Sequence, residues 1–179
     1  KQTLPLIKKA NALYKKFEPS RHKKQLDLAR LTPEFQIEDT AFSTLTVNYN
    51  WRTACHRDAG DLRDGYSVIL VAEKGKFNGG LLGYPRFRVC VDVRQGDFLL
   101  KDPHQQHCNT KIEPLSDDWG RLSMVMYYRE RMQKCAKKGV KKNLLESMSL
   151  EQLRKASGIE GKTKKETIEK IMARHLING

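Results

Sequence analysis

The sequence has no long apolar run and only four cysteines. No stretch is long enough to span a membrane, and nothing at its start has the pattern of a signal peptide. The four cysteines are widely spread, without a C-x-x-C pair or the spacing of a disulfide framework. These absences exclude an integral membrane protein and a disulfide-rich secreted domain. We therefore expect a soluble intracellular protein of the cytoplasm, nucleoid or nucleus, encoded by a cell or a virus.

Acidic residues are outnumbered, with 21 Asp and Glu against 34 Lys and Arg, and the formal net charge is +13. The charge is uneven: residues 1–30 carry nine Lys/Arg against two acids, and residues 129–179 carry fourteen against six. Residues 31–128 carry eleven against thirteen and are nearly neutral. Basic flanks around a neutral centre favour a polyanionic partner such as DNA, because binding releases counterions. The alternative is a pair of helices kept soluble by lysine.

The hydropathy pattern indicates an α+β fold. An apolar stripe at helical spacing predicts an amphipathic helix over residues 4–17, and helical patterns return beyond residue 129. The segment 86–93 alternates, which predicts a strand with Phe87, Val89, Val91 and Val93 on one face. β-Branched content predicts a strand over 42–48, and alternation predicts one over 121–128. A nearly continuous apolar run predicts a central core strand over 66–72, and a short strand is expected over 98–100.

The central segment contains a candidate metal site. His56 and Asp58 are two residues apart, so on a strand their side chains point to the same face. His107 can supply a second imidazole. Two histidines and one carboxylate leave three coordination positions open, as in non-haem Fe(II) oxygenases. The pattern also allows a plain ion pair between His56 and a neighbouring carboxylate.

A zinc site is a second possibility, because Cys55 adjoins His56 and Cys108 adjoins His107. Four such side chains would match the closed coordination of structural zinc. We favour instead a packing role for both cysteines, since free cysteine behaves as a small buried hydrophobe.

The alternating segment 121–128 contains a candidate anion site. Arg121 and Ser123 share one face of this predicted strand with Val125 and Tyr127. A guanidinium fork beside a hydroxyl is well suited to a carboxylate.

The order of these motifs resembles a known superfamily. H-x-D at 56–58 is followed by F-x-G-G-x-L-x-x-P at 77–85, G-D-x-L at 96–99, His107 and R-x-S-x-V-x-Y at 121–127. This order resembles the 2-oxoglutarate/Fe(II) dioxygenases, whose core is a double-stranded β-helix, or jelly roll. A-C-H-R-D at 54–58 with G-Y-S-V at 65–68 is similar to the TET/JBP branch, which oxidises the 5-methyl group of pyrimidines in DNA.

The resemblance implies roles for the site residues. His56, Asp58 and His107 would bind Fe(II), and Arg121 with Ser123 would hold 2-oxoglutarate. Asn48 is a further candidate for 2-oxoglutarate, although Asn50 or Tyr49 would serve the same argument.

His104 competes with His107 as the distal ligand. The residues after His107 resemble the stretch that follows this ligand in the family, and its distance from Arg121 is usual there. We therefore favour His107 and expect His104 either behind the metal ligands or near the substrate.

Three more residues are candidates for contact with the substrate. Asp61 lies where TET/JBP relatives contact the extruded base, and a carboxylate there would accept from an exocyclic amine or, if protonated, donate to a carbonyl. Its alternative role is to cap the bend before Gly65. Trp51 and Arg52 lie near H-x-D and could stack on or clamp nucleic acid, although tryptophan is more often buried.

These observations predict three parts: a basic helical flank over 1–35, a dioxygenase core over 36–130 and a helical module over 131–179. Ser149 and Thr163 are placed to cap two short helices, a pattern that resembles SAP-like DNA-binding modules. We expect a monomeric enzyme that uses molecular oxygen to hydroxylate 5-methylcytosine, or alternatively thymine, in DNA. An oxygenase acting on a protein or a free nucleotide, and a non-catalytic DNA-binding jelly roll, are the alternatives.

Overall fold

The computed structural model describes residues 3–135 and 145–177, and the chain divides into two compact units. The first unit comprises residues 1–30 and 34–130, and the second comprises 31–33 and 131–179. Among the described residues, no helix is both long and apolar enough to cross a membrane.

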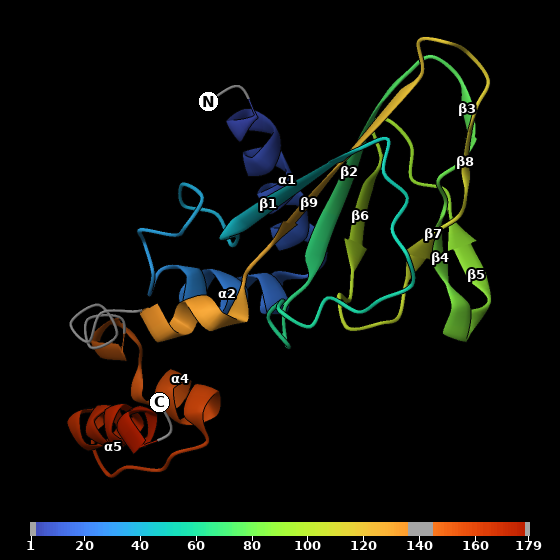
Figure 1. The fold of residues 1–179 in the computed structure, drawn as a ribbon. Coiled ribbons are helices and arrows are strands. Elements are labelled where there is room, and N and C mark those ends of the chain that lie inside the picture. The colour runs from blue at the N-terminus through green and yellow to red at the C-terminus, as the bar shows by residue number, and fades with distance from the viewer. Residues whose placement is uncertain (1–2, 136–144, 178–179) are drawn as a thin grey trace. The chain divides into compact units, whose positions relative to one another are not determined.

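The first unit combines two helices with three antiparallel sheets (Figure 1). The main sheet has the order β1-β9-β2-β6, and the smaller sheets are β3-β8 and β5-β4-β7. The fold is α+β with a jelly-roll-like core. The element bounds are α1 (Leu4–Phe17), α2 (Pro19–Ala29), β1 (Thr44–Tyr49), β2 (Ser67–Lys74), β3 (Phe77–Gly79), β4 (Leu82–Tyr84), η1 (Pro85–Phe87), β5 (Val89–Val91), β6 (Phe98–Lys101), β7 (Cys108–Asn109), β8 (Ile112–Pro114) and β9 (Gly120–Tyr127).

The main sheet has two different faces because side chains alternate along each strand. On β2, Val68 and Leu70 pack with Met126 of β9 in the cluster that includes α1. Ile69 and Val71 point the other way and pack against the smaller sheets. Figure 1 shows α1 and α2, in blue, on one side of this sheet and the smaller sheets on the other. The second face is the one that carries the functional residues.

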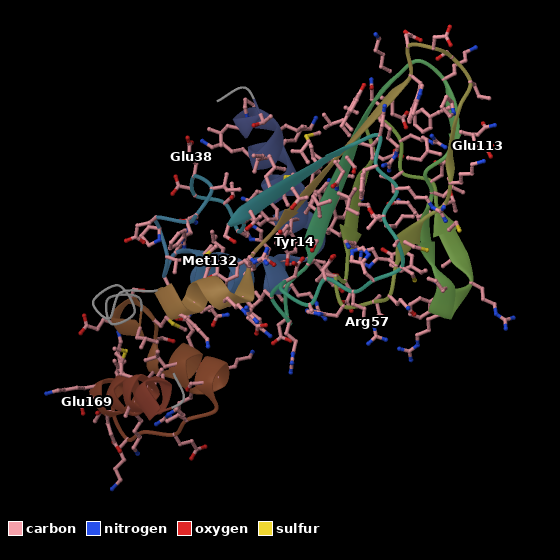
Figure 2. All side chains as sticks on the ribbon, viewed as in Figure 1. Tyr14, Glu38, Arg57, Glu113, Met132 and Glu169 are labelled. Carbon is pink, nitrogen blue, oxygen red and sulfur yellow. The ribbon has the colours of Figure 1, made fainter. Side chains whose placement is uncertain are left out.

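Helix α1 covers the first face. Ile7, Ala10 and Tyr14 are buried in it, and Tyr14 lies among the side chains between helix and sheet (Figure 2). The Tyr14 hydroxyl donates to Gln25 Oε1 at 3.1 Å and accepts from the Tyr66 backbone N–H at 3.0 Å. This buried network joins both helices to the start of β2.

The predicted strand over 86–93 is wrong in its first half. Pro85 opens the short 3-10 helix η1, and Arg88 follows in the left-handed region with φ 54°. Tyr84 then pairs with Val89, so the segment is the tip of a β4–β5 hairpin. Phe87 and Val89 are consequently 54% and 50% exposed, whereas Val93 is buried. The turn interrupts the alternation that the sequence pattern indicated.

The second unit contains α4 (Leu150–Ser157) and α5 (Lys164–Ile177). Both predicted caps are confirmed: the Ser149 side chain accepts from the Gln152 backbone N–H, and Thr163 Oγ1 accepts from the Glu166 N–H at 3.2 Å. A small core contains Leu153, Ile168 and Ile171. The 3-10 helix η2 spans Glu130–Cys135, and the rest of the helix predicted after residue 129 lies outside the described residues.

Candidate metal and cosubstrate site

Pairing with a distant segment positions the H-x-D residues. His56 and His107 form an isolated antiparallel bridge, in which each backbone N–H donates to the other residue's carbonyl at 3.0 Å. The Asp58 N–H donates to the Pro103 carbonyl at 3.0 Å. The segment is therefore extended without forming a regular strand. His56 and Asp58 still face inward, while Arg57 between them is exposed (Figure 2).

Backbone carbonyls determine which nitrogen each histidine offers. Nδ1 of His56 donates to the Ala54 carbonyl at 2.8 Å, and Nδ1 of His107 donates to the Gln105 carbonyl at 2.8 Å. A carbonyl can only accept, so the lone pair of each neutral ring is on Nε2. The two Nε2 atoms lie 3.0 Å and 3.5 Å from the carboxylate oxygens of Asp58.

This donor set fits a divalent metal ion. One ligand atom from each of His56, Asp58 and His107 lies within 4.8 Å of the others. Histidine ligands commonly donate their second ring N–H to a carbonyl, as both do here. Burial lowers the pKa of His107, which favours the neutral ring that a metal requires. Two imidazoles and a carboxylate suit Fe(II).

Sequence reasoning missed Lys101, at the end of β6. It is 5% exposed, and its Nζ lies 2.6 Å from Asp58 Oδ2 and 2.6 Å from His107 Nε2. Burial lowers the pKa of Lys101, against the attraction of Asp58. Burial raises the pKa of Asp58, but the charge and hydrogen bond of Lys101 outweigh it, so the net shift is downward. Lysine is rarely buried without a partner, but nothing local in the sequence identified this one.

The face of β9 predicted from alternation forms the wall beside the ligands. Arg121 and Ser123 line a cavity of about 350 Å³ together with His56, Asp58 and His107. Arg121 is 5% exposed and Ser123 is 8% exposed.

Asn48, Tyr49 and Asn50, the three candidates for a further 2-oxoglutarate contact, lie in different environments at the end of β1. Asn48 pairs with Ser123 in the sheet register and lines the same cavity. Asn50 instead accepts the Arg121 backbone N–H at 2.7 Å through its side-chain Oδ1. Tyr49 is 64% exposed.

Two glycines of the F-x-G-G motif pack closely against neighbouring segments of the site, where a side chain would not fit. Gly79 and Gly80 have φ of +76° and +70°, a region that favours glycine. A Cβ on Gly80 would lie 3.2 Å from Cδ and Nε of Arg121, and one on Gly79 would lie 1.8 Å from the Lys111 carbonyl oxygen. The motif therefore shapes the space in which the Arg121 side chain lies.

Asp61 also lines the cavity and is 6% exposed. Its Oδ2 accepts from the Ser67 hydroxyl at 2.7 Å, while the Gly65 N–H donates to the Leu62 carbonyl. The Asp61 carboxylate is therefore bound to Ser67, and a backbone hydrogen bond closes the turn that ends at Gly65. Burial raises the pKa of Asp61 to about 6, so both of its protonation states are accessible near neutral pH.

The other three substrate candidates lie differently. Trp51 is 64% exposed and contributes to the cavity lining, so it lies at the rim rather than in a core. Arg52 is exposed and donates from Nε to the Asn109 carbonyl at 3.3 Å, outside the cavity lining. His104 does not line the cavity, and among the described residues its Nε2 is buried without a hydrogen-bond partner.

Residues 1–130 match the Tet/JBP family, described as the oxygenase domain of the 2OGFeDO superfamily. The chain belongs to this family. The superfamily's cofactors are Fe(II) and 2-oxoglutarate, which agrees with the donor set of His56, Asp58 and His107.

Curated relatives of this Tet/JBP domain include thymine dioxygenases. It is 43% identical over 128 residues to thymine dioxygenase JBP1-B of Trypanosoma cruzi, which covers 70% of this chain and 15% of that protein. It is 35% identical over 152 residues to the bifunctional helicase and thymine dioxygenase JBP2 of Leishmania major, covering 85% and 14%. The chain therefore spans only about a seventh of these relatives' length.

A solved structure of NgTET1 in complex with 5mC DNA has a similar fold. The TM-score is 0.58 at 14% sequence identity, over 71% of this chain and 48% of that one.

The structure excludes a zinc site made from the neighbouring cysteines in this Tet/JBP domain. Cys55 and Cys108 alternate with His56 and His107 along paired segments, so they point to the opposite face and do not line the cavity. The expectation that Cys55 packs in a core is also wrong, because it is exposed, and Cys108 is half-buried.

Proposed function

We propose that this chain is a 2-oxoglutarate- and Fe(II)-dependent dioxygenase that hydroxylates the 5-methyl group of a pyrimidine in DNA. One observation carries the proposal. His56, Asp58 and His107 converge in the same cavity as a buried arginine and serine, Arg121 and Ser123. Membership of the Tet/JBP family supports the reaction class.

The protein contributes binding and orientation. His56 Nε2, His107 Nε2 and the Asp58 carboxylate would hold the iron. Arg121 and Ser123, with Asn48 beside them, would hold the far carboxylate of 2-oxoglutarate. When bound, these cofactors activate molecular oxygen and supply the oxidising chemistry for the methyl group.

The cavity also restricts how DNA presents its base. A methyl group inside a duplex cannot reach a metal in such a cavity, so the base must be extruded or single-stranded. Asp61 is placed to read it: the carboxylate would accept from the exocyclic amine of 5-methylcytosine, and the acid would donate to O4 of thymine. The names of the relatives favour thymine, whereas our sequence-based expectation favoured 5-methylcytosine. Trp51 at the cavity rim offers a stacking surface.

Both flanks support DNA as the partner. Residues 1–30 and 129–179 are strongly basic, and the α4–α5 hairpin of the second unit is a SAP-like candidate for binding the backbone. We propose the division into an N-terminal flank (1–35), an oxygenase core (36–130) and a C-terminal module (131–179) on this basis.

The decisive experiment is mass spectrometry of nucleosides from DNA incubated aerobically with the full chain, Fe(II) and 2-oxoglutarate. One substrate contains 5-methylcytosine and the other contains only the four ordinary bases. We expect 5-hydroxymethylcytosine or 5-hydroxymethyluracil, no product with His56→Ala, and normal product with the exposed neighbour variant Arg57→Ala.

One observation favours a non-catalytic DNA-binding jelly roll as a second candidate. The Lys101 ammonium lies within hydrogen-bond distance of two of the three proposed ligands, where it competes with a metal ion. Anaerobic addition of Fe(II) and 2-oxoglutarate separates the two cases. A charge-transfer absorption supports the oxygenase, and its absence in protein that still binds DNA supports the alternative.

A further inference from the structure

Cys55, Cys108 and Cys90 form a row on the face opposite the metal ligands. The antiparallel bridge of His56 with His107 places Cys55 directly across from Cys108. Cys108 of β7 pairs with Gly83 of β4, which pairs in turn with Cys90 of β5. Residues that pair laterally share a face, so all three thiols lie on one side.

Cys55 and Cys108 are close enough to bond. His56 and His107 exchange both backbone hydrogen bonds, so the adjacent pair is a non-hydrogen-bonded one, for which Cα atoms lie about 4.5 Å apart. Disulfides need Cα separations of about 4.4–6.8 Å.

Cys90 lies on the same face as Cys108 but is too far from it to form a disulfide. Its Sγ and that of Cys108 each lie 3.5 Å from the position that a Cβ on Gly83 would occupy. Strand β4 separates Cys90 from Cys108, and two strand spacings amount to about 10 Å between Cα atoms. That exceeds the limit of about 7 Å for a disulfide without backbone movement. Cys90 is therefore an exposed thiol that lacks a bonding partner in this row.

We propose that Cys55 and Cys108 are a redox-active dithiol, a modification site behind the metal ligands that closes to a disulfide. Cys55 is exposed and meets the oxidant first, while Cys108 is half-buried and positioned to react with it. The disulfide ties together the two segments that carry His56 and His107.

The oxidant is a small hydroperoxide such as hydrogen peroxide. The Cys55 sulfur attacks one peroxide oxygen, the O–O bond breaks, and a sulfenic acid and water form. The Cys108 sulfur then attacks the Cys55 sulfur and forms the S–S bond. The departing hydroxide takes the Cys108 proton and leaves as a second water. Two thiols are oxidised, one peroxide is reduced, and a thiol reductant reverses the change.

The test treats the full chain, loaded with redox-stable Mn(II), with equimolar hydrogen peroxide. Peptide mapping by mass spectrometry without reduction should show the Cys55 and Cys108 peptides joined, with two hydrogens lost from the intact mass. Dithiothreitol should restore the original mass. Cys90→Ser should form the same crosslink, and Cys55→Ser and Cys108→Ser should not. Circular dichroism and Mn(II) binding verify that each variant is folded.

Three results would overturn the proposal, and each can be read in the unsubstituted protein. They are a crosslink that contains Cys90, oxidation of Cys55 to a sulfinic acid without a crosslink, and no loss of hydrogens under excess peroxide. Phenylarsine oxide, which bridges close thiol pairs, gives an independent readout. It should bind the unsubstituted chain and Cys90→Ser in equal amounts, and lose binding with Cys55→Ser.

Discussion

The ammonium of Lys101 lies 2.6 Å from Oδ2 of Asp58 in the interior of the domain. The same Nζ lies 2.6 Å from Nε2 of His107, the atom that a metal ion would use. A positive charge from the protein thus neutralises the carboxylate of the proposed metal site. The pair keeps Asp58 ionised and oriented, but a metal ion must displace Lys101 from His107.

Replacing Lys101 with methionine separates these two effects. Mn(II) should bind roughly tenfold more tightly to Lys101→Met, since one charge-assisted hydrogen bond no longer competes with the ion. Without metal, the variant should be less stable by about 1–3 kcal/mol, because Asp58 loses its buried partner. Manganese titration followed by electron paramagnetic resonance, and urea unfolding, measure the two quantities. Lys111→Met, at an exposed lysine, is the matched control. Unchanged Mn(II) affinity would contradict the competition.

The two histidines that compete for the distal ligand role can be told apart by substitution. His107→Gln should abolish Mn(II) binding at micromolar concentrations, because one of three ligands is lost. His104→Gln should retain it, since His104 is neither in the ligand group nor in the cavity lining. Isothermal titration with Mn(II) measures both variants. Loss of binding in His104→Gln alone would reverse the assignment.

Arg121 should control the affinity for 2-oxoglutarate. Arg121→Lys keeps a positive charge but loses the planar fork that matches a carboxylate. We expect the dissociation constant for 2-oxoglutarate to rise about ten- to hundredfold, the size of a charge-assisted hydrogen bond of about 1.5–3 kcal/mol. Anaerobic titration of the Fe(II)-loaded protein gives this constant. Arg57→Lys, at an exposed arginine, should leave it unchanged, and an equal loss in both variants would exclude a specific role for Arg121.

The raised pKa of Asp61 predicts that the free energy of unfolding depends on pH. Burial raises its pKa to about 6, so the folded state holds the proton more tightly than the unfolded chain. The stabilisation is complete below about pH 4, the unfolded pKa, and is lost as the pH rises through about 6, by roughly 3 kcal/mol at most. Urea unfolding of the unsubstituted chain and of Asp61→Asn between pH 4 and pH 7 measures this difference. An identical pH dependence in both proteins would contradict it.

The same titration should shift the choice of base. Above pH 6 the Asp61 carboxylate should favour 5-methylcytosine, and below pH 6 the acid should favour thymine. The ratio of the two products from one mixed DNA substrate, measured at several pH values, checks this. A ratio that changes equally in Asp61→Asn would remove Asp61 from base recognition.

The second unit should bind DNA phosphates. Lys162 and Lys165 are exposed, and replacing both with glutamine should weaken DNA binding for every sequence. The slope of affinity against salt should fall by up to about two, one for each lysine replaced. Fluorescence anisotropy over a salt series measures this slope. The paired variant Lys9→Gln with Lys15→Gln on α1 shows whether the first flank contributes instead.

Local patterns in the sequence were sufficient for much of the fold. The predicted helix over residues 4–17 coincides with α1, and alternation placed Arg121, Ser123, Val125 and Tyr127 together on the cavity face of β9. Serine and threonine caps placed α4 and α5. These features depend on neighbours a few residues apart, so periodicity and capping chemistry reveal them.

Other features depended on which distant segments pair. The spacing of His56 and Asp58 indicated that their side chains share a face. The backbone bridge to His107 then decides that His107, and not His104, supplies the second imidazole. In the sequence, Lys101 is only the polar residue that ends an apolar strand. In the folded chain it is buried, and its ammonium contacts both Asp58 and His107.

The sequence by itself determined the residue types of the site and their directions along each strand, because both follow from the local geometry of an extended chain. Tertiary structure decided which residues meet, including the Cys55–Cys108 pair, because the pairing of segments about fifty residues apart depends on the fold of the whole domain.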